Sequence, residues 1–187
     1  MDWGIAEGLI YENTEFTEFQ ISELRRQKGI KSAFGLDFGF TDPSAFVACL
    51  IDEDARKIYI FDELYETGLT NQQLADKIIN LGYGGERIYC DSAEPKSIQE
   101  LRDHGLRAEP SRKGRDSVLH GIQKIQNYKL VVHPRCPNFW HEVNNYCWEK
   151  DKFGKPIDKP EHEWSHLMDG MRYACSRVLL GDTFSFN

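Results

Sequence analysis

The 187-residue chain lacks several features that would each decide its class. It contains no GxxxxGK[ST] loop, so we expect no P-loop ATPase within it. No apolar run approaches the roughly 18–20 residues that a membrane span needs, so no transmembrane segment is predicted. Basic residues are not in excess, because the net charge is −7. An acidic chain does not bind polyanions by overall charge, so a nucleic-acid role would need a local basic patch and a bound cation.

Cysteine is present, but in no pattern that suggests a disulfide framework or a zinc site. The chain has five cysteines, an odd number, and none of them forms a CxxC pair. Cys49, Cys90 and Cys175 lie in apolar stretches, where reduced core cysteines are expected, which predicts a reducing compartment. With 40% hydrophobic residues, a chain of this length can bury one sizeable core without cross-links.

The apolar pattern predicts an α/β fold with a mixed sheet of five to six strands. We expect strands at residues 32–39, 45–52, 57–65, 86–91, 106–109 and 129–133, and helices at residues 71–82, 95–105, 116–127, 137–148 and 164–180. The first three strands form an antiparallel meander, and the later strands alternate with helices, which places helices on both faces. The polar stretch at residues 149–164 predicts an exposed hairpin that forms a flap near the C-terminus.

Two acids belong to the first and fourth predicted strands. Asp37 lies inside the first strand, flanked by Leu36 and Phe38, and Asp91 ends the fourth strand. The strand order makes these strands parallel neighbours, so their C-terminal ends, and the two carboxylates, should meet at one edge of the sheet. Carboxylates this close repel each other unless one is protonated or a cation lies between them. Alternatively, backbone N–H groups of the turn could hold Asp37.

A third acid lies on the last predicted helix. Asp169 follows His166 by three residues, so both project from one face of that helix. Three carboxylates and an imidazole form an oxygen-rich set that suits Mg²⁺ or Mn²⁺, whereas zinc favours cysteine or more histidine. Two such ions about 3.5–4 Å apart could clamp the attacking and leaving oxygens of a phosphodiester. The plainer alternatives are a helix histidine in an ordinary hydrogen bond and a surface acid.

Three stretches together resemble a known family. They are GLDFGFTDPSAF at residues 35–46, IYCDSAEP at residues 88–95 and HEWSHLMDGMRYA at residues 162–174. In this order they resemble the nuclease domain of the large terminase subunit of tailed double-stranded DNA bacteriophages. The resemblance runs from about Lys31 to Leu180 and implies a ribonuclease-H-like fold.

The resemblance also implies a division of the chain and a setting for it. Family members carry an N-terminal ATPase, so we expect residues 1–30 to be a linker or arm from a missing N-terminal domain. Residues 31–187 would then form the nuclease domain. The implied partners are double-stranded DNA, the terminase small subunit, the ATPase domain and the portal. The implied location is the cytoplasm of the infected bacterial host.

By the same resemblance, Asp37, Asp91 and Asp169 correspond to the acidic triad of the family. His166 matches a histidine that some members have where others have Asn or Asp. The implied activity is metal-dependent cutting of double-stranded phage DNA concatemers during genome packaging. The implied cofactor is Mg²⁺ or Mn²⁺, with two ions in the site.

Holding DNA requires cations, and the best predicted basic patch is the loop with Arg112, Lys113 and Arg115. The alternative is a solvated loop without a partner. The predicted hairpin also carries lysines, although acids between them largely cancel their charge. They are Lys150, Lys152, Lys155 and Lys159. We therefore expect the isolated domain to bind DNA weakly.

Two other functions remain open from the sequence. An actin-like phosphotransferase uses D-x-G-x-T to open a phosphate-binding hairpin, and DFGFTDP at residues 37–43 fits that pattern weakly. A chain of this length is short for the two lobes of such enzymes. The other alternative is a non-catalytic docking module of a DNA-packaging motor, in which the acids would be vestigial.

Overall fold

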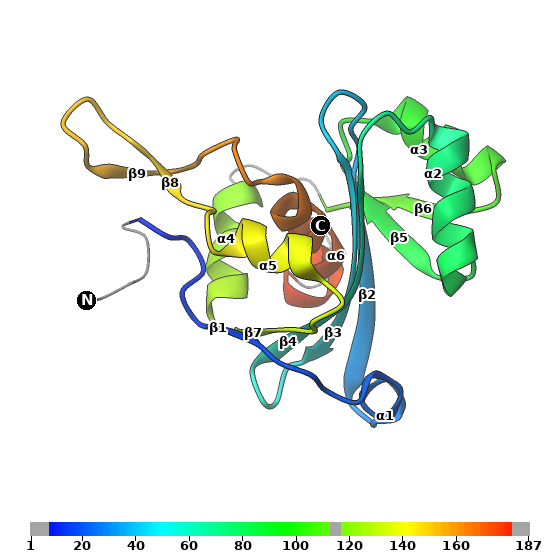
Figure 1. The fold of residues 1–187 in the computed structure, drawn as a ribbon, viewed down its shortest axis with the longest axis horizontal. Coiled ribbons are helices and arrows are strands. Elements are labelled where there is room, and N and C mark those ends of the chain that lie inside the picture. Colours follow the sequence, from blue (N-terminus) through cyan, green and yellow to red (C-terminus); the bar gives the residue numbers. More distant parts are fainter. Residues whose placement is uncertain (1–7, 113–116, 181–187) are drawn as a thin grey trace, which may run out of the picture.

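The computed structural model describes residues 8–112 and 117–180, which form a mixed sheet covered by helices on both faces (Figure 1). The seven-stranded sheet has the order β1-β7-β4-β3-β2-β5-β6. Its strands are β1 (Thr14–Phe16), β2 (Ile30–Asp37), β3 (Ser44–Asp52), β4 (Lys57–Glu66), β5 (Arg87–Cys90), β6 (Arg107–Pro110) and β7 (Lys129–Val132). A two-stranded hairpin consists of β8 (Trp148–Lys150) and β9 (Pro156–Pro160) and projects from the body.

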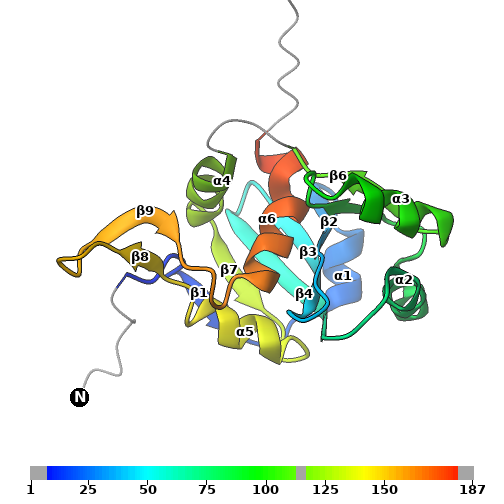
Figure 2. The ribbon, with the colours of Figure 1, turned by 90° about the horizontal axis from the view of Figure 1, so that it is seen from above.

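The helices divide between the two faces of the sheet, as Figure 2 shows from above. They are α1 (Ile21–Arg26), α2 (Asn71–Ile78) with the π-helical turn η1 (Ile79–Tyr83), α3 (Pro95–Asp103), α4 (Ser117–Gln126), α5 (Pro137–Val143) and α6 (His166–Leu179). One hydrophobic core joins the sheet to α4, α5 and α6, and a second joins it to α2 and α3. The predicted antiparallel meander, parallel strands and C-terminal hairpin are therefore confirmed.

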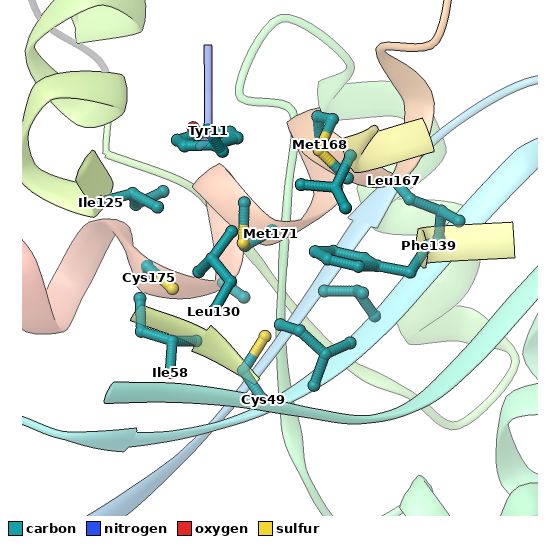
Figure 3. Packing of buried hydrophobic residues seen from close by; sticks show 14 of the residues in the cluster. Tyr11, Cys49, Ile58, Ile125, Leu130, Phe139, Leu167, Met168, Met171 and Cys175 are labelled. Carbon is teal, nitrogen blue, oxygen red and sulfur yellow. The ribbon is translucent and has the colours of Figure 1, made fainter. Parts of the chain in front are cut away.

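Strand β3 is the centre of both cores because its two faces are buried. Ala45, Val47 and Cys49 point into the first core, whereas Phe46 and Ala48 point into the second. In the first core, Cys49 lies beneath Met171 and Cys175 of α6 (Figure 3). An uninterrupted apolar run is what a doubly covered strand requires, and each fully buried large side chain contributes about 1.5–3 kcal/mol.

The seventh strand comes from the segment that the sequence suggested was an arm. Residues Thr14–Phe16 pair in parallel with β7, and Phe16 stacks on Trp140 with ring centroids 5.1 Å apart. Ile10 and Tyr11, which precede this strand, are buried in the first core. A three-residue edge strand is too short to show a periodic pattern, so the sequence predicted fewer strands.

Several helix boundaries differ from the predictions. Helix α5 ends at Val143 and not near residue 148, because the chain turns there toward the hairpin. Helix α6 begins at His166, since Trp164 has a positive φ of 62° that a helix does not allow. Helix α2 begins at Asn71 as predicted, and Thr70 is its N-cap, where it forms a capping box with Gln73.

Helix α6 crosses β2 at backbone-to-backbone distance. A Cβ atom on Gly35 would lie 1.9 Å from the carbonyl oxygen of Gly170 and 2.7 Å from the nitrogen of Ala174. A Cβ atom on Gly170 would lie 3.9 Å from the nitrogen of Asp37. Glycine at these positions therefore brings the first turns of α6 against the end of β2.

None of the helices that the structure describes is long and apolar enough to cross a membrane.

Candidate metal centre

Strand pairing places two acids side by side at one edge of the sheet. Strands β2 and β5 run in parallel, with Leu36 opposite Cys90. Asp37 and Asp91 each follow directly after this pair, so they lie next to each other, as the strand order predicts. Asp91 also accepts a hydrogen bond from the backbone N–H of Ala93 (2.9 Å), which fixes its side chain in the turn.

The first turn of α6 brings His166 and Asp169 to the same place. The Nδ1 atom of His166 lies 3.5 Å from Oδ2 of Asp37, and both side chains are largely buried. Asp169 lies one residue before Gly170, whose backbone packs against the end of β2. All four residues that the sequence singled out as metal ligands are thus brought together from β2, the turn after β5, and α6.

Burial, and to a smaller extent mutual repulsion, raises the pKa values of two acids in this cluster. Burial raises the pKa of Asp37, and the neighbouring Asp91 raises it further, while His166 opposes the change. Burial also raises the pKa of Asp169 to about 6, with Arg172 opposing and Asp37 adding to the rise. The pKa of His166 is raised, chiefly by its contact with Asp37. A cation bound between the acids would reverse these effects.

Arg172 partly neutralises the cluster. Its Nη2 atom lies 3.1 Å from Oδ1 of Asp169, one helical turn away, and its guanidinium lies 4.9 Å from the Tyr173 ring centroid. Within the described residues, the buried Nε atom of Arg172 has no hydrogen-bond partner. Arg172 was not among the predicted site residues, although its place three residues after Asp169 was a usable signal.

Glu142 is a second residue that the sequence analysis missed. It lies on α5, is 1% exposed, and its Oε1 atom accepts hydrogen bonds from the backbone N–H groups of Leu167 (2.7 Å) and Met168 (3.3 Å). Burial raises the pKa of Glu142 to about 7. This carboxyl group thus caps the N-terminus of α6 and holds the turn that carries His166. Only the packing of α5 on α6 creates the contact, so no local pattern reveals it.

A cavity of about 690 Å³ opens beside Asp169, between the hairpin, α4 and α6. Its lining includes Asp169 and Arg172 of α6, Lys159 of β9 and Ser117 of α4. Asp169 is therefore the member of the cluster that faces this cavity. One of the hairpin lysines is paired with an acid, since Nζ of Lys159 lies 3.7 Å from Oε2 of Glu149.

The predicted basic patch is only partly within the described structure. The backbone N–H of Arg112 donates to Oγ of Ser176 on α6 (3.4 Å), which ties the end of β6 to that helix. Lys113 and Arg115 lie outside the described residues. A DNA-binding role for this loop stays a prediction.

The mixed sheet, the covering helices and the small hairpin define the ribonuclease-H-like class of α/β domains. The sequence model of the family described as Terminase RNAseH like domain matches residues 37–177. The chain belongs to this family.

Curated relatives are large terminase subunits. The chain is 36% identical over 172 residues to the large terminase subunit of Bacillus phage SPP1, which covers 89% of this chain and 41% of that protein. It is 32% identical over 150 residues to the PBSX phage terminase large subunit of Bacillus subtilis (strain 168), covering 79% of this chain and 35% of that protein. The chain thus spans about two fifths or less of these two relatives.

Solved nuclease domains share the fold. The large terminase nuclease domain of bacteriophage SPP1 with bound Mn superposes with a TM-score of 0.81 at 36% identity, covering 90% of this chain and 98% of that one. The P22 large terminase nuclease domain superposes with a TM-score of 0.67 at 14% identity, covering 94% and 95%. At 14% identity, the P22 match supports the assignment of the fold and nothing further.

Proposed function

We propose that this domain is a divalent-metal-dependent endonuclease that cuts double-stranded phage DNA concatemers during genome packaging. The observation that carries the proposal is the convergence of three acids and a histidine from separate elements. Asp37, Asp91, Asp169 and His166 meet at the end of β2 although 132 residues separate the first from the third. Buried, mutually repelling carboxylates are costly to a fold, so their presence favours a functional site.

The donor set fits Mg²⁺ or Mn²⁺. Asp37, Asp91 and Asp169 offer carboxylate oxygens, which both ions prefer. Burial raises the pKa values of Asp37 and Asp169, so a bound cation would stabilise their ionised forms. The similar SPP1 nuclease domain was solved with bound Mn, which supports the same choice here. Two bound ions would supply Lewis-acid stabilisation of the attacking and leaving oxygens of an in-line phosphodiester displacement.

The chain's own residues position the reaction. Strand β2 and the turn at Asp91 fix two carboxylates on rigid elements, and the Glu142 cap fixes the turn of α6 with the other groups. His166, held against Asp37, either completes the ligand set or orients the attacking water. Arg172 lines the cavity beside Asp169, so its guanidinium can meet a phosphate oxygen there.

DNA would enter from the cavity side. We propose that the loop with Arg112, Lys113 and Arg115 contacts the phosphate backbone, and that the hairpin of β8 and β9 lies against the duplex. The net charge of −7 argues for weak binding by the isolated domain. The terminase small subunit, an ATPase domain and the portal would then deliver the DNA in the cytoplasm of the infected host.

Nicking of supercoiled plasmid in Mn²⁺ tests this function. Asp37→Ala, Asp91→Ala and Asp169→Ala should each lower the nicking rate by about three orders of magnitude, because each removes several kcal/mol of charge stabilisation. Asp54→Ala, in the exposed turn after β3, is the matched control and should keep the rate. Full cutting by any triad variant would reject the scheme. A folded wild-type domain that binds no Mn²⁺ or Mg²⁺ in calorimetry would favour a docking module.

A further inference from the structure

A second group of metal-ligand side chains lies beside the acid cluster. Asp42, His162 and His166 each offer one ligand atom, and these atoms lie within 4.8 Å of one another. Nε2 of His162 is 3.6 Å from Oδ2 of Asp42, and the rings of His162 and His166 stand nearly perpendicular with centroids 5.6 Å apart. The group joins three segments: the turn between β2 and β3, the chain after β9, and the first residue of α6.

Local structure fixes two of these segments. In the turn, Oγ of Ser44 donates to the carbonyl oxygen of Gly39 (2.8 Å), and a Cβ atom on Gly39 would lie 2.4 Å from the carbonyl oxygen of Asp42. Only glycine allows that close approach, so the turn is tightly folded around Asp42. On the other side, Oγ of Ser165 donates to the carbonyl oxygen of His162, which ties His162 to the start of α6.

We propose that Asp42, His162 and His166 form a peripheral binding site for a borderline transition-metal ion, such as Zn²⁺ or Co²⁺. Two imidazoles and one carboxylate suit such ions, whereas Mg²⁺ selects oxygen ligands and keeps its water. Asp42 and His162 are exposed, with side-chain exposures of 60% and 82%, so an ion reaches the site from solvent and water fills its remaining positions.

The peripheral site is coupled to the acid cluster because the two share His166. This residue lies 3.5 Å from Asp37 on one side and belongs to the Asp42–His162 group on the other. An ion held by Asp42 and His162 engages His166 and places a positive charge next to the cluster, where it repels other cations. Filling the peripheral site therefore weakens Mn²⁺ binding by Asp37, Asp91 and Asp169. This consequence rests on the proposed function, whereas the site itself does not.

Cobalt absorption spectroscopy tests the site directly. A variant carrying Asp37→Asn, Asp91→Asn and Asp169→Asn lacks the acid cluster but keeps the peripheral group. Titrated with Co²⁺, it should bind one ion with d–d absorption bands characteristic of nitrogen and oxygen ligands. Adding His162→Ala should weaken that binding at least about tenfold, since one of three protein ligands is lost. Adding His104→Ala, at the residue that follows α3 and outside the group, is the matched control and should leave the binding unchanged.

His162→Ala alone, in the otherwise unchanged protein, keeps the test valid if the triple variant does not fold. It should lose one Co²⁺ equivalent in calorimetry and retain Mn²⁺-dependent nicking, while inhibition of that nicking by Zn²⁺ should be relieved at least about tenfold. Equal Co²⁺ binding with and without His162 overturns the site. Loss of Mn²⁺ binding in Asp91→Asn reports on the acid cluster alone, so failure of the proposed function is separately visible.

Discussion

Two aspartates of this domain, the buried Asp62 and the partly buried Asp169, have opposite surroundings. Asp62 of β4 is 6% exposed, and its Oδ2 atom accepts hydrogen bonds from the hydroxyl of Tyr83 (2.6 Å) and from Nη2 of Arg135 (2.9 Å). Its Oδ1 atom accepts from the backbone N–H of Glu63 (2.9 Å). Both oxygens therefore have donors, and Asp62 joins β4 to the turns around it.

Asp169 is less well compensated. Arg172 lies 3.1 Å from it, yet burial and the negative charge of Asp37 still raise its pKa to about 6. This difference in hydrogen-bond donors distinguishes a structural carboxylate from one expected in a functional site. A carboxylate with matched donors stabilises the fold, whereas one crowded against other acids costs stability until a cation binds.

Substituting each acid in turn is the strongest test of whether Asp62 stabilises the fold and Asp169 does not. Asp62→Ala should lower the free energy of unfolding by about 3 kcal/mol, because it leaves Tyr83 and Arg135 without their acceptor. Asp169→Asn should leave the metal-free domain as stable as before or more stable. Urea denaturation measures both, and Asp62→Asn controls for side-chain volume. Equal losses for Asp62→Ala and Asp169→Asn would remove the distinction.

The approach of α6 to β2 is the next feature to test. Gly35→Ala should destabilise the domain by about 2 kcal/mol, because the added Cβ overlaps the backbone of α6 and pushes it outward. The same displacement should weaken Mn²⁺ binding, since His166 and Asp169 move with the helix. Gly85→Ala is the matched control, with open space around the added atom. Similar thermal unfolding of the two variants would contradict the close contact.

The pH dependence of stability tests the compensation of Asp169 without metal. The folded pKa of Asp169, about 6, lies above its ordinary value of 3.8. The stabilisation that the folded protein gains from the protonated carboxyl group is therefore fully present below about pH 4 and is lost as pH rises through 6. The Asp169→Asn variant does not lose stability in this way, because an Asn side chain does not titrate. Its stability relative to wild type should therefore rise by on the order of 2 kcal/mol between pH 4 and pH 7. A pH-independent difference in denaturation experiments would argue against a crowded Asp169.

The smallest expected effect concerns Glu142, which acts through α6. Glu142→Gln keeps an acceptor for the N–H groups of Leu167 and Met168, so stability should fall by about 1 kcal/mol. The nicking rate should fall several-fold at saturating Mn²⁺, because the turn with His166 is held less firmly. Glu142→Ala should cost more on both measures. Identical kinetics for all three proteins would show that the cap does not position the site.

The sequence predicted the architecture because its main signals are local. The doubly buried β3 shows as an unbroken apolar run, and the element order makes β2 and β5 neighbours, which places Asp37 beside Asp91. The motif around Asp169 then indicated the third acid. Periodicity and spacing thus sufficed for strands β2 to β7 and for the acids as candidates.

The remaining features depend on contacts between distant segments. Edge strand β1 pairs with β7, more than 100 residues away, and its three residues carry no period. The Glu142 cap and the approach of His162 to Asp42 arise only when α5 and the chain after β9 pack onto the body. Sequence patterns report which face of an element is buried, but not which side chain lies opposite.

A crystal of the domain soaked in Mn²⁺, measured at the manganese absorption edge, tests the central claim most directly. We predict anomalous peaks within ligand distance of the carboxylates of Asp37, Asp91 and Asp169, at the end of β2. Ordered manganese elsewhere on the surface, with these three carboxylates bare at saturating Mn²⁺, would contradict the account.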